Sequence, residues 1–141
     1  MDERQIVAFR LGEEEYAVSI QDVREIIRPT TVTRVPRTAE FIKGVINLRG
    51  VVVPVINLHQ RFGNTEEQVT DQARIIILNK EEIIVGITVD NVTEVIRIKE
   101  EDIEDPDFTE AVDSKYIEGV GKYKERLLLL LDIKKTLGID N

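Results

Sequence analysis

Alternation of apolar and polar residues with a period of two is the feature of this sequence that most limits its fold. Apolar side chains occupy every second position of residues 7–11 and again of residues 16–20, with the polar segment Gly12–Glu15 between them. A period of two is typical of a half-buried strand, so the two segments predict a β-hairpin. No strand–helix–strand unit of the usual length follows, which argues against a parallel α/β sheet.

Further strand-like segments follow at a spacing of roughly 8–12 residues, which is typical of an all-β barrel or sandwich. Pro54 lies inside one of them and predicts an edge strand or a bulge there, because proline has no amide hydrogen to donate. The segment 63–72 is polar and without period, and we expect a loop. Strands are expected at residues 31–35, 45–48, 51–58, 75–78, 83–89, 92–98, 116–120 and 127–131.

One segment near the N-terminus has two possible structures. Val23, Ile26 and Ile27 are spaced at i, i+3 and i+4, which favours a short helix that stops before Pro29. The alternative is an irregular strand. The spacing gives the helix a slight preference.

Two other short segments predict helical turns. Residues 39–43 have the composition of one turn, and Gly44 would stop it. Near the C-terminus, Asp132 is placed to cap a helix over residues 133–137, which Gly138 would end.

Composition excludes several classes of function. The chain has 27 acidic and 19 basic residues, a net charge of −8 and a pI of about 4.8, so its average field repels nucleic acid and anionic lipid. We therefore expect protein partners. The absence of cysteine excludes disulfides, thiolate chemistry and the common zinc frameworks. Without a secretory pattern or a long apolar run, the sequence predicts a cytoplasmic protein.

The residues that carry catalysis are scarce. Neither Ser19 nor Ser114 lies in a nucleophile elbow, and His59 is the only histidine, which we interpret as a surface or partly packed side chain. The glycines of 119–121 lack the rest of a phosphate-binding loop and predict a turn. The acidic residues between 100 and 107 lack the spacing of a calcium loop and predict a solvated loop.

Arg49 departs from the pattern around it, because a charged residue follows one apolar run and, with Gly50, precedes another. Two interpretations remain open. Gly50 permits a turn with positive φ while Arg49 points to solvent, or a carboxylate holds Arg49 so that it shapes a binding surface.

Several segments together resemble the CheW family of bacterial chemotaxis proteins. Their order and spacing hold from about Ile6 to Leu137. The stretch Phe-Ile-Lys-Gly-Val-Ile-Asn-Leu-Arg-Gly at 41–50 is the most specific. The matching segments are 16–26, 41–50, 53–58, 85–90 and 116–121.

The resemblance implies an all-β fold: one CheW-like domain over residues 1–141, made of two intertwined SH3-like, five-stranded β-barrel lobes that share an apolar seam. It implies no catalysis, cofactor or metal. The implied partners are the regulatory domain of the histidine kinase CheA and the cytoplasmic tips of methyl-accepting chemoreceptors. The chain would then be an adaptor, monomeric when free, that is recruited to membrane-associated receptor arrays and couples receptor state to kinase activity.

The resemblance also implies site residues. Glu25 and Arg49 match positions that pair and shape an interface, and Gly44 matches a position near the kinase contact. With Gly50, these make a kinase or receptor interface. A receptor-binding groove is implied at Val7, Ile20, Val23 and Ile26.

A hypothesis from another class stands beside the adaptor. Abundant acidic residues allow a small carboxylate-based hydrolase, or a ligand-binding β-barrel, since catalytic carboxylates meet in space rather than in sequence. A deep polar pocket with two converging carboxylates of perturbed pKa would favour this rival.

Overall fold

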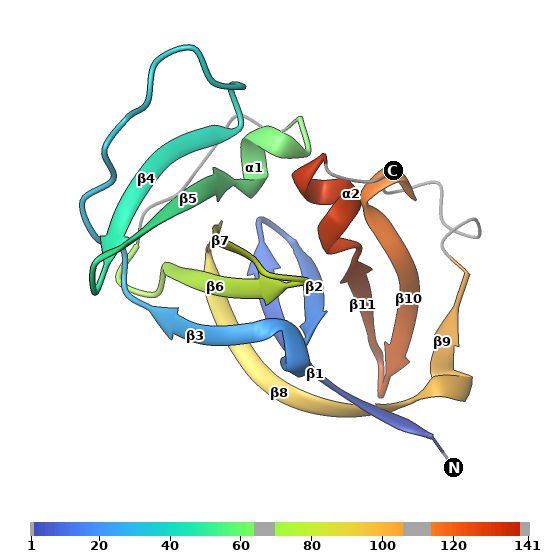
Figure 1. Ribbon diagram of the computed structural model, residues 1–141. Helices are drawn as coiled ribbons and strands as arrows, with labels where there is room; N and C mark the ends of the chain where they lie inside the picture. Colours follow the sequence, from blue (N-terminus) through green and yellow to red (C-terminus); the bar gives the residue numbers. More distant parts are fainter. Residues whose placement is uncertain (1, 64–69, 106–113, 139–141) are drawn as a thin grey trace. The chain divides into compact units, whose positions relative to one another are not determined.

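The computed structural model describes residues 2–63, 70–105 and 114–138, and strands predominate among them (Figure 1). The chain divides into two compact units: unit 1 is Met1–Gln21 with Thr93–Asn141, and unit 2 is Asp22–Val92. The chain leaves unit 1 to form unit 2 and then returns. The prediction of an all-β protein with a few short helices is confirmed.

A six-stranded sheet forms unit 1, apart from the first two residues of β8. Its order is β8-β1-β2-β11-β10-β9, and the pairing of β2 with β11 is parallel. The strand β9 has only two residues and adds a sixth strand to the five predicted. The strands are β1 (Glu3–Leu11), β2 (Glu14–Ser19), β8 (Asn91–Lys99), β9 (Ile103–Glu104), β10 (Ile117–Tyr123) and β11 (Arg126–Leu131).

Side chains two residues apart build the core of unit 1. The strands β1 and β2 form the predicted hairpin, but residues 6–9 and 15–18 are buried on both faces rather than one. Ala8 and Ala17 stand at the alternate positions that the period of two predicts to face solvent. Alanine can nevertheless be buried there, because its side chain has no polar group to desolvate. The core cluster is Ile6, Ala8, Ala17, Ile96, Ile98, Leu128 and Leu130.

A five-stranded sheet forms unit 2, in the order β3-β6-β7-β5-β4. The strands β5 and β7 pair in parallel, and the other pairs are antiparallel. Its core cluster is Ile46, Val53, Val55, Ile75 and Ile77. The strands are β3 (Val23–Ile27), β4 (Ile42–Leu48), β5 (Val51–Asn57), β6 (Arg74–Lys80) and β7 (Ile83–Val89).

The helices are single turns or little more. The helix α2 (Ile133–Leu137) begins and ends as predicted, because Asp132 accepts a hydrogen bond from the Lys135 amide (3.1 Å) and Gly138 has φ 76°. The helix α1 (Leu58–Arg61) was not predicted. The described residues also include three 3₁₀ turns: η1 (Ile20–Asp22), η2 (Glu100–Asp102) and η4 (Ser114–Tyr116). In the described residues, no helix has the length and apolarity that crossing a membrane requires.

The helix favoured over Val23–Ile27 is wrong. These residues form the edge strand β3, which hydrogen-bonds to β6 with a register shift between Val23 and Glu25. The alternative of an irregular strand is therefore the observed one. Backbone bonds to β6, about fifty residues away, outweigh a local spacing that would also suit a helix.

Three other local predictions need correction. Residues 39–43 form a turn and the start of β4 instead of a helical turn. The expected strand 31–35 reduces to one bridge, between Thr33 and Val45. The glycines of 119–121 lie inside β10 rather than in a turn. There a Cβ atom on Gly121 would lie 2.7 Å from Ile98, so close packing explains the glycine.

Other predictions hold within limits. The strands expected at 75–78 and 83–89 are β6 and β7, which pair as an antiparallel hairpin. Pro54 lies where β5 has only β4 as a neighbour, because pairing with β7 begins at Val55. The predicted loop 63–72 and the acidic segment 100–107 lie partly outside the described residues; within them, the acidic segment contains η2 and β9.

Candidate functional site

The turn between β4 and β5 is the centre of the candidate site. Arg49 and Gly50 are its two central residues, with φ of 52° and 88°. Two successive positive φ angles characterise the tight turns that match the twist of a β-hairpin. The Gly50 amide donates a hydrogen bond to Asn47 Oδ1 at 2.8 Å, which holds the turn from inside.

An ion pair fixes the Arg49 side chain. Arg49 Nη2 donates to Glu25 Oε2 on β3, so the two residues that the family resemblance implies as a pair are in contact, while their role at an interface stays a prediction. The hydrogen bond and the charge of Glu25 raise the pKa of Arg49 above its ordinary value. The strands β3 and β4 are opposite edges of the five-stranded sheet, and the pair joins one edge to the turn beside the other.

The pair lies at the surface. The Arg49 side chain is 66% exposed and that of Glu25 is 25% exposed. Beside it the hairpin presents Val51 and Val52, which are 45% and 67% exposed. A charged pair next to uncovered apolar side chains is the composition of a protein–protein contact.

Gly44 has a different environment from the rest of the predicted interface. It lies buried in β4 with φ 152°. A Cβ atom there would lie 2.2 Å from the Thr33 carbonyl oxygen and 2.7 Å from Val32 Cγ1. Glycine is therefore required for the segment before β4 to lie against the strand, which is a packing role whatever contacts this region makes.

The four residues of the predicted receptor groove differ in accessibility. Val7 on β1 is 2% exposed, whereas Ile26 on β3 is 40% exposed. Ile20 in η1 and Val23 on β3 are partly buried. Val7 and Ile20 belong to unit 1, and Val23 and Ile26 to unit 2. The groove stays a prediction, with Ile26 as its most accessible member.

A charge network around the buried Glu15 of unit 1 was not predicted from the sequence. Glu15 at the start of β2 accepts hydrogen bonds from Arg126 Nε (3.0 Å), Arg126 Nη2 (2.6 Å) and Thr93 Oγ1 (2.7 Å). Arg126 also donates to Glu94 at 2.5 Å. Nothing local indicates these partners, because Glu15 and Arg126 are 111 positions apart.

The electrostatics of Glu15 follow from this network. Burial raises the pKa of the carboxyl group, but the hydrogen bonds from Arg126 and Thr93 and the charge of Arg126 outweigh it, and the pKa is lowered. The same contacts raise the pKa of Arg126. Every charge in the network has a partner, so its role is to hold β2, β8 and β11 together.

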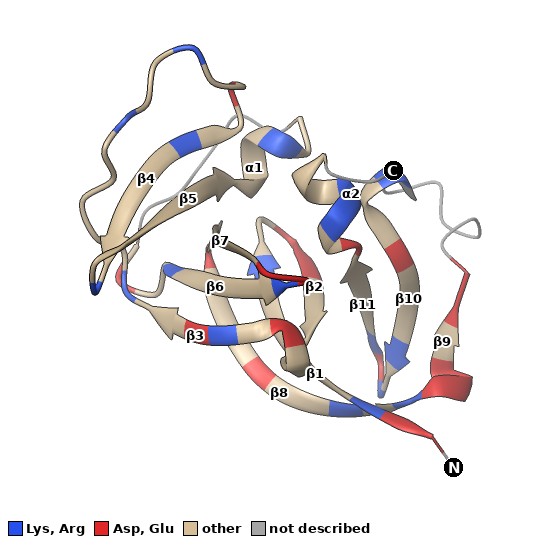
Figure 2. Ribbon diagram, in the orientation of Figure 1, with Lys and Arg blue, Asp and Glu red and all other residues tan. Residues whose placement is uncertain are grey.

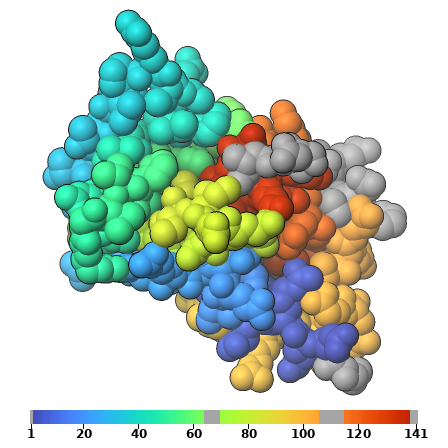
Figure 3. Space-filling view, viewed as in Figure 1, coloured from blue at the N-terminus to red at the C-terminus, as the bar shows by residue number. Residues whose placement is uncertain are grey.

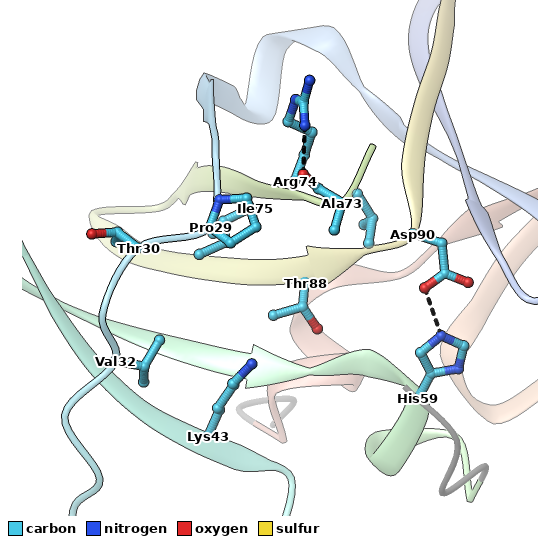
Figure 4. A pocket seen from close by; sticks show the side chains of 11 residues that line it. Pro29, Thr30, Val32, Lys43, His59, Ala73, Arg74, Ile75, Thr88 and Asp90 are labelled. Atoms are coloured by element: carbon cyan, nitrogen blue, oxygen red, sulfur yellow. Dashed lines mark hydrogen bonds and ion pairs between the residues drawn. The ribbon is translucent and has the colours of Figure 1, made fainter. Parts of the chain in front are cut away.

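His59 lines a small pocket of unit 2, about 40 Å³ in volume (Figure 4). It is only 5% exposed, more deeply buried than predicted, and its Nε2 lies 2.8 Å from Asp90 Oδ1. Figure 4 shows Thr88 between this pair and Lys43. Asp90 is the only acidic residue among those that line this pocket, so the pair of carboxylates that the rival hypothesis needs is not found here.

Comparison with known proteins identifies the family. The family model described as the CheW-like domain matches residues 5–140. The chain is 40% identical over 135 residues to the chemotaxis protein CheW of Klebsiella aerogenes, covering 95% of this chain and 81% of that protein. It is 37% identical to the chemotaxis protein CheW of Helicobacter pylori, covering 96% and 82%.

A solved structure agrees in fold as well as in sequence. The scaffolding protein TtCheW from Thermoanaerobacter tengcongensis superimposes with a TM-score of 0.87 at 38% identity. The match covers 93% of this chain and 90% of that protein, so it includes both sheets.

Proposed function

The chain belongs to the CheW-like domain family and is a chemotaxis adaptor rather than an enzyme, and we propose that it couples chemoreceptors to the histidine kinase CheA. In this proposal the chain binds the regulatory domain of the kinase and the cytoplasmic tips of methyl-accepting receptors. It changes kinase activity by position alone, without a reaction of its own. Residues 1–141 would act as one CheW-like domain that contains both units, recruited from the cytoplasm to receptor arrays.

The Glu25–Arg49 ion pair is the observation that carries the proposal. An ion pair this exposed contributes little to folding, because water screens it. It does, however, hold the β4–β5 turn in one position relative to β3. A surface with a fixed arrangement of charge and apolar groups is what selective recognition of a protein requires.

The proposal assigns two surfaces. Glu25, Gly44, Arg49 and Gly50 would form or support a kinase or receptor interface around the β4–β5 turn. The second surface is the receptor groove predicted at Val7, Ile20, Val23 and Ile26, of which Ile26 is the most exposed. An apolar strand edge of this kind suits contact with the apolar face of a receptor helix.

Reconstitution tests the coupling directly. The purified chain, CheA and membranes that contain a chemoreceptor are combined, and kinase autophosphorylation is measured with and without attractant. We expect strong, attractant-sensitive activity only when all three are present. Unchanged kinase activity when the chain is added, with no binding to the isolated regulatory domain of CheA, would contradict the proposal.

Arg49→Ala is the informative variant, and Arg24→Ala is its matched control. Arg24 lies on the same strand as Glu25, is exposed, and forms no ion pair with a described residue. Arg49→Ala should lower coupling at an unchanged melting temperature, and Arg24→Ala should leave coupling intact. An equal loss of coupling in both variants would show that coupling depends on the overall positive charge of this surface rather than on the fixed position of the β4–β5 turn.

A further inference from the structure

The segment between β3 and β4, residues 28–41, crosses unit 2 as a strap that has almost no secondary structure of its own. Backbone hydrogen bonds fasten it to the sheet at two places. Thr33 N donates to Val45 O and Val45 N to Thr33 O on β4, both at 2.8 Å, and Asn57 N of β5 donates to Phe41 O at 2.8 Å. The close approach depends on Gly44, whose missing side chain leaves room for Thr33. The strap is therefore held in a defined position over the edge strand β4.

The strap carries three exposed arginines that have no partner among the described residues. Arg28, Arg34 and Arg37 form no ion pair with any residue that the structure describes, although the chain has 27 acidic residues. Figure 2 shows the basic positions along the strap and on β4, and Figure 3 shows the strap at the surface of unit 2. In so acidic a chain, three cations left unpaired on one segment are available to an external anion.

The backbone conformation at Arg37 indicates that this part of the strap is constrained. Its φ is 64°, in the left-handed region that costs a residue with a side chain about 1–2 kcal/mol. Thr38 Oγ1 donates to the Val35 carbonyl oxygen at 3.0 Å and closes the turn around it. The turn thereby holds the backbone that carries the arginine in one conformation.

An open hollow of about 520 Å³ lies beside the strap and is lined by the strap, β4, Asn57 of β5 and Gln60 of α1. Three cations line it, Arg34, Arg37 and Lys43, together with the polar side chains of Asn57 and Gln60. Val35, Pro36 and Ile42 add apolar surface. Glu40 is the single acidic residue of the lining.

We propose that the 28–41 strap and this hollow form a docking surface for an acidic segment of a partner protein. Discrete carboxylates match the arginines, and the apolar lining matches the side chains between them. A nucleic acid or an anionic membrane fits less well, because the chain as a whole has a net charge of −8 and repels an extended polyanion. The inference goes beyond the proposed function in naming the chemistry of a partner segment.

A glutamate-rich peptide with interspersed leucines is the probe. Amide chemical shifts of the isotope-labelled protein are followed during titration with this peptide, and in parallel with single-stranded DNA and with phosphatidylserine vesicles. We expect saturable shifts confined to residues 28–45 and 57–60, weakened by salt. Stronger binding of DNA or vesicles than of the peptide, or peptide shifts located elsewhere, would overturn the proposal.

Two sets of variants separate an organised site from general charge. The triple variant R28E/R34E/R37E should bind the peptide at least about tenfold more weakly, because it reverses the complementary charges. The control R97E/K99E/K124E changes the same amount of charge on exposed residues of unit 1 and should bind normally. Equal weakening in the two would show a diffuse electrostatic effect and contradict a defined surface.

Gly44→Ala provides a test without any change in charge. If it displaces the strap while the protein stays folded, peptide affinity should fall although all three arginines remain. Retained affinity in a folded Gly44→Ala protein would show that the fixed position of the strap does not matter for binding.

A second copy of the chain is another occupant that these variants test. If the protein self-associates and R28E/R34E/R37E abolishes the self-association, the occupant is a second copy and the proposal of a partner protein is overturned. Failure of the peptide to bind leaves the CheA reconstitution unaffected, so the two proposals fail separately.

Discussion

Glu15 shows how one side chain can join strands that are far apart in the sequence. Glu15 lies near the start of β2 and is 8% exposed. Its carboxylate accepts hydrogen bonds from Arg126 of β11 and from Thr93 of β8. A buried carboxylate is costly unless it is paired and hydrogen-bonded. Here both conditions are met, so the network stabilises unit 1. The loss of any one member would leave the others without a partner.

Replacing Glu15 with Gln should therefore destabilise the protein by about 1–3 kcal/mol at neutral pH, because Arg126 and Thr93 lose a charged acceptor. The pKa of Glu15 in the folded state lies below its ordinary value of 4.5. Its stabilisation is therefore fully present above about pH 4.5 and is lost as the pH falls through the folded-state pKa. Urea unfolding of both proteins at several pH values measures the difference.

Glu118→Gln is the control for this experiment. Glu118 pairs with Arg4 at 3.2 Å, but its side chain is 47% exposed. The free energy of unfolding should change little, within about 0.5 kcal/mol. A difference between wild type and Glu15→Gln that stayed constant down to strongly acidic pH would argue that the carboxylate charge is not what stabilises unit 1.

The Glu25–Arg49 pair should behave in the opposite way: its loss should have a small effect on the free energy of unfolding and a large effect on coupling. We expect Arg49→Ala and Glu25→Ala each to lower receptor-controlled kinase activation by about fivefold or more, with melting temperatures nearly unchanged. The double variant should be little worse than either, because residues in contact are not additive. Strictly additive losses in this double-mutant cycle would show that the two side chains act separately.

Among the elements, the edge strand β4 can be covered by the 28–41 strap only because Gly44 has no side chain. Gly44→Ala would place a Cβ atom 2.2 Å from the Thr33 carbonyl oxygen. The expected loss of stability is about 3 kcal/mol, typical of overpacking, or the strap moves away. Thermal unfolding measures the first outcome, and protease sensitivity within residues 28–41 the second.

Gly50→Ala is the comparison for that loss. Gly50 also has positive φ, but no atom lies within 4 Å of its ideal Cβ position. Only the backbone conformation is penalised, by about 1–2 kcal/mol. Similar losses at Gly44 and Gly50, with the strap unaffected in both, would rule out the packing role of Gly44.

Neighbouring residues of β3 offer a test of the receptor groove. Ile26 is 40% exposed, whereas Ile27 packs against the core of unit 2. Ile26→Lys should leave stability within about 0.5 kcal/mol of wild type and weaken receptor binding, while Ile27→Lys should cost about 2 kcal/mol or more. Co-sedimentation with receptor-containing membranes measures binding. Normal binding of a folded Ile26→Lys protein would remove β3 from the groove.

At the level of the whole molecule, charge is divided unevenly between the two units. The residues of unit 1 include 18 acidic and 10 basic side chains, whereas unit 2 has nine of each. The net charge of −8 therefore belongs to unit 1, and the basic strap belongs to the neutral unit. This division leaves unit 2 the better surface for an acidic partner.

The net charge also predicts the state of the free protein. We expect a monomer at micromolar concentration, because repulsion between copies opposes association through the exposed apolar residues of unit 2. Sedimentation velocity checks this at low and at high salt. A stable dimer or larger oligomer without any partner would contradict it.

Features that depend on neighbours in the chain were predictable from sequence. The β6–β7 hairpin, the β4–β5 turn with its positive φ angles, and the capped helix α2 all follow from alternation, turn residues and capping groups a few positions apart. The family motifs cover the same short segments. They identified the fold class. The Glu25–Arg49 pair joins two of these segments, 24 positions apart, and was implied by the family resemblance rather than by local pattern.

Features that depend on distant partners were decided only by the tertiary structure. Val23–Ile27 is a strand because β6 supplies its hydrogen bonds, Gly44 is indispensable because Thr33 crosses it, and Glu15 is buried beside Arg126, 111 positions away. Local spacing favours conformations by fractions of a kilocalorie, whereas a paired strand edge or a buried ion requires its partner to be in place. That is why the strap and its unpaired arginines became visible only in the folded chain.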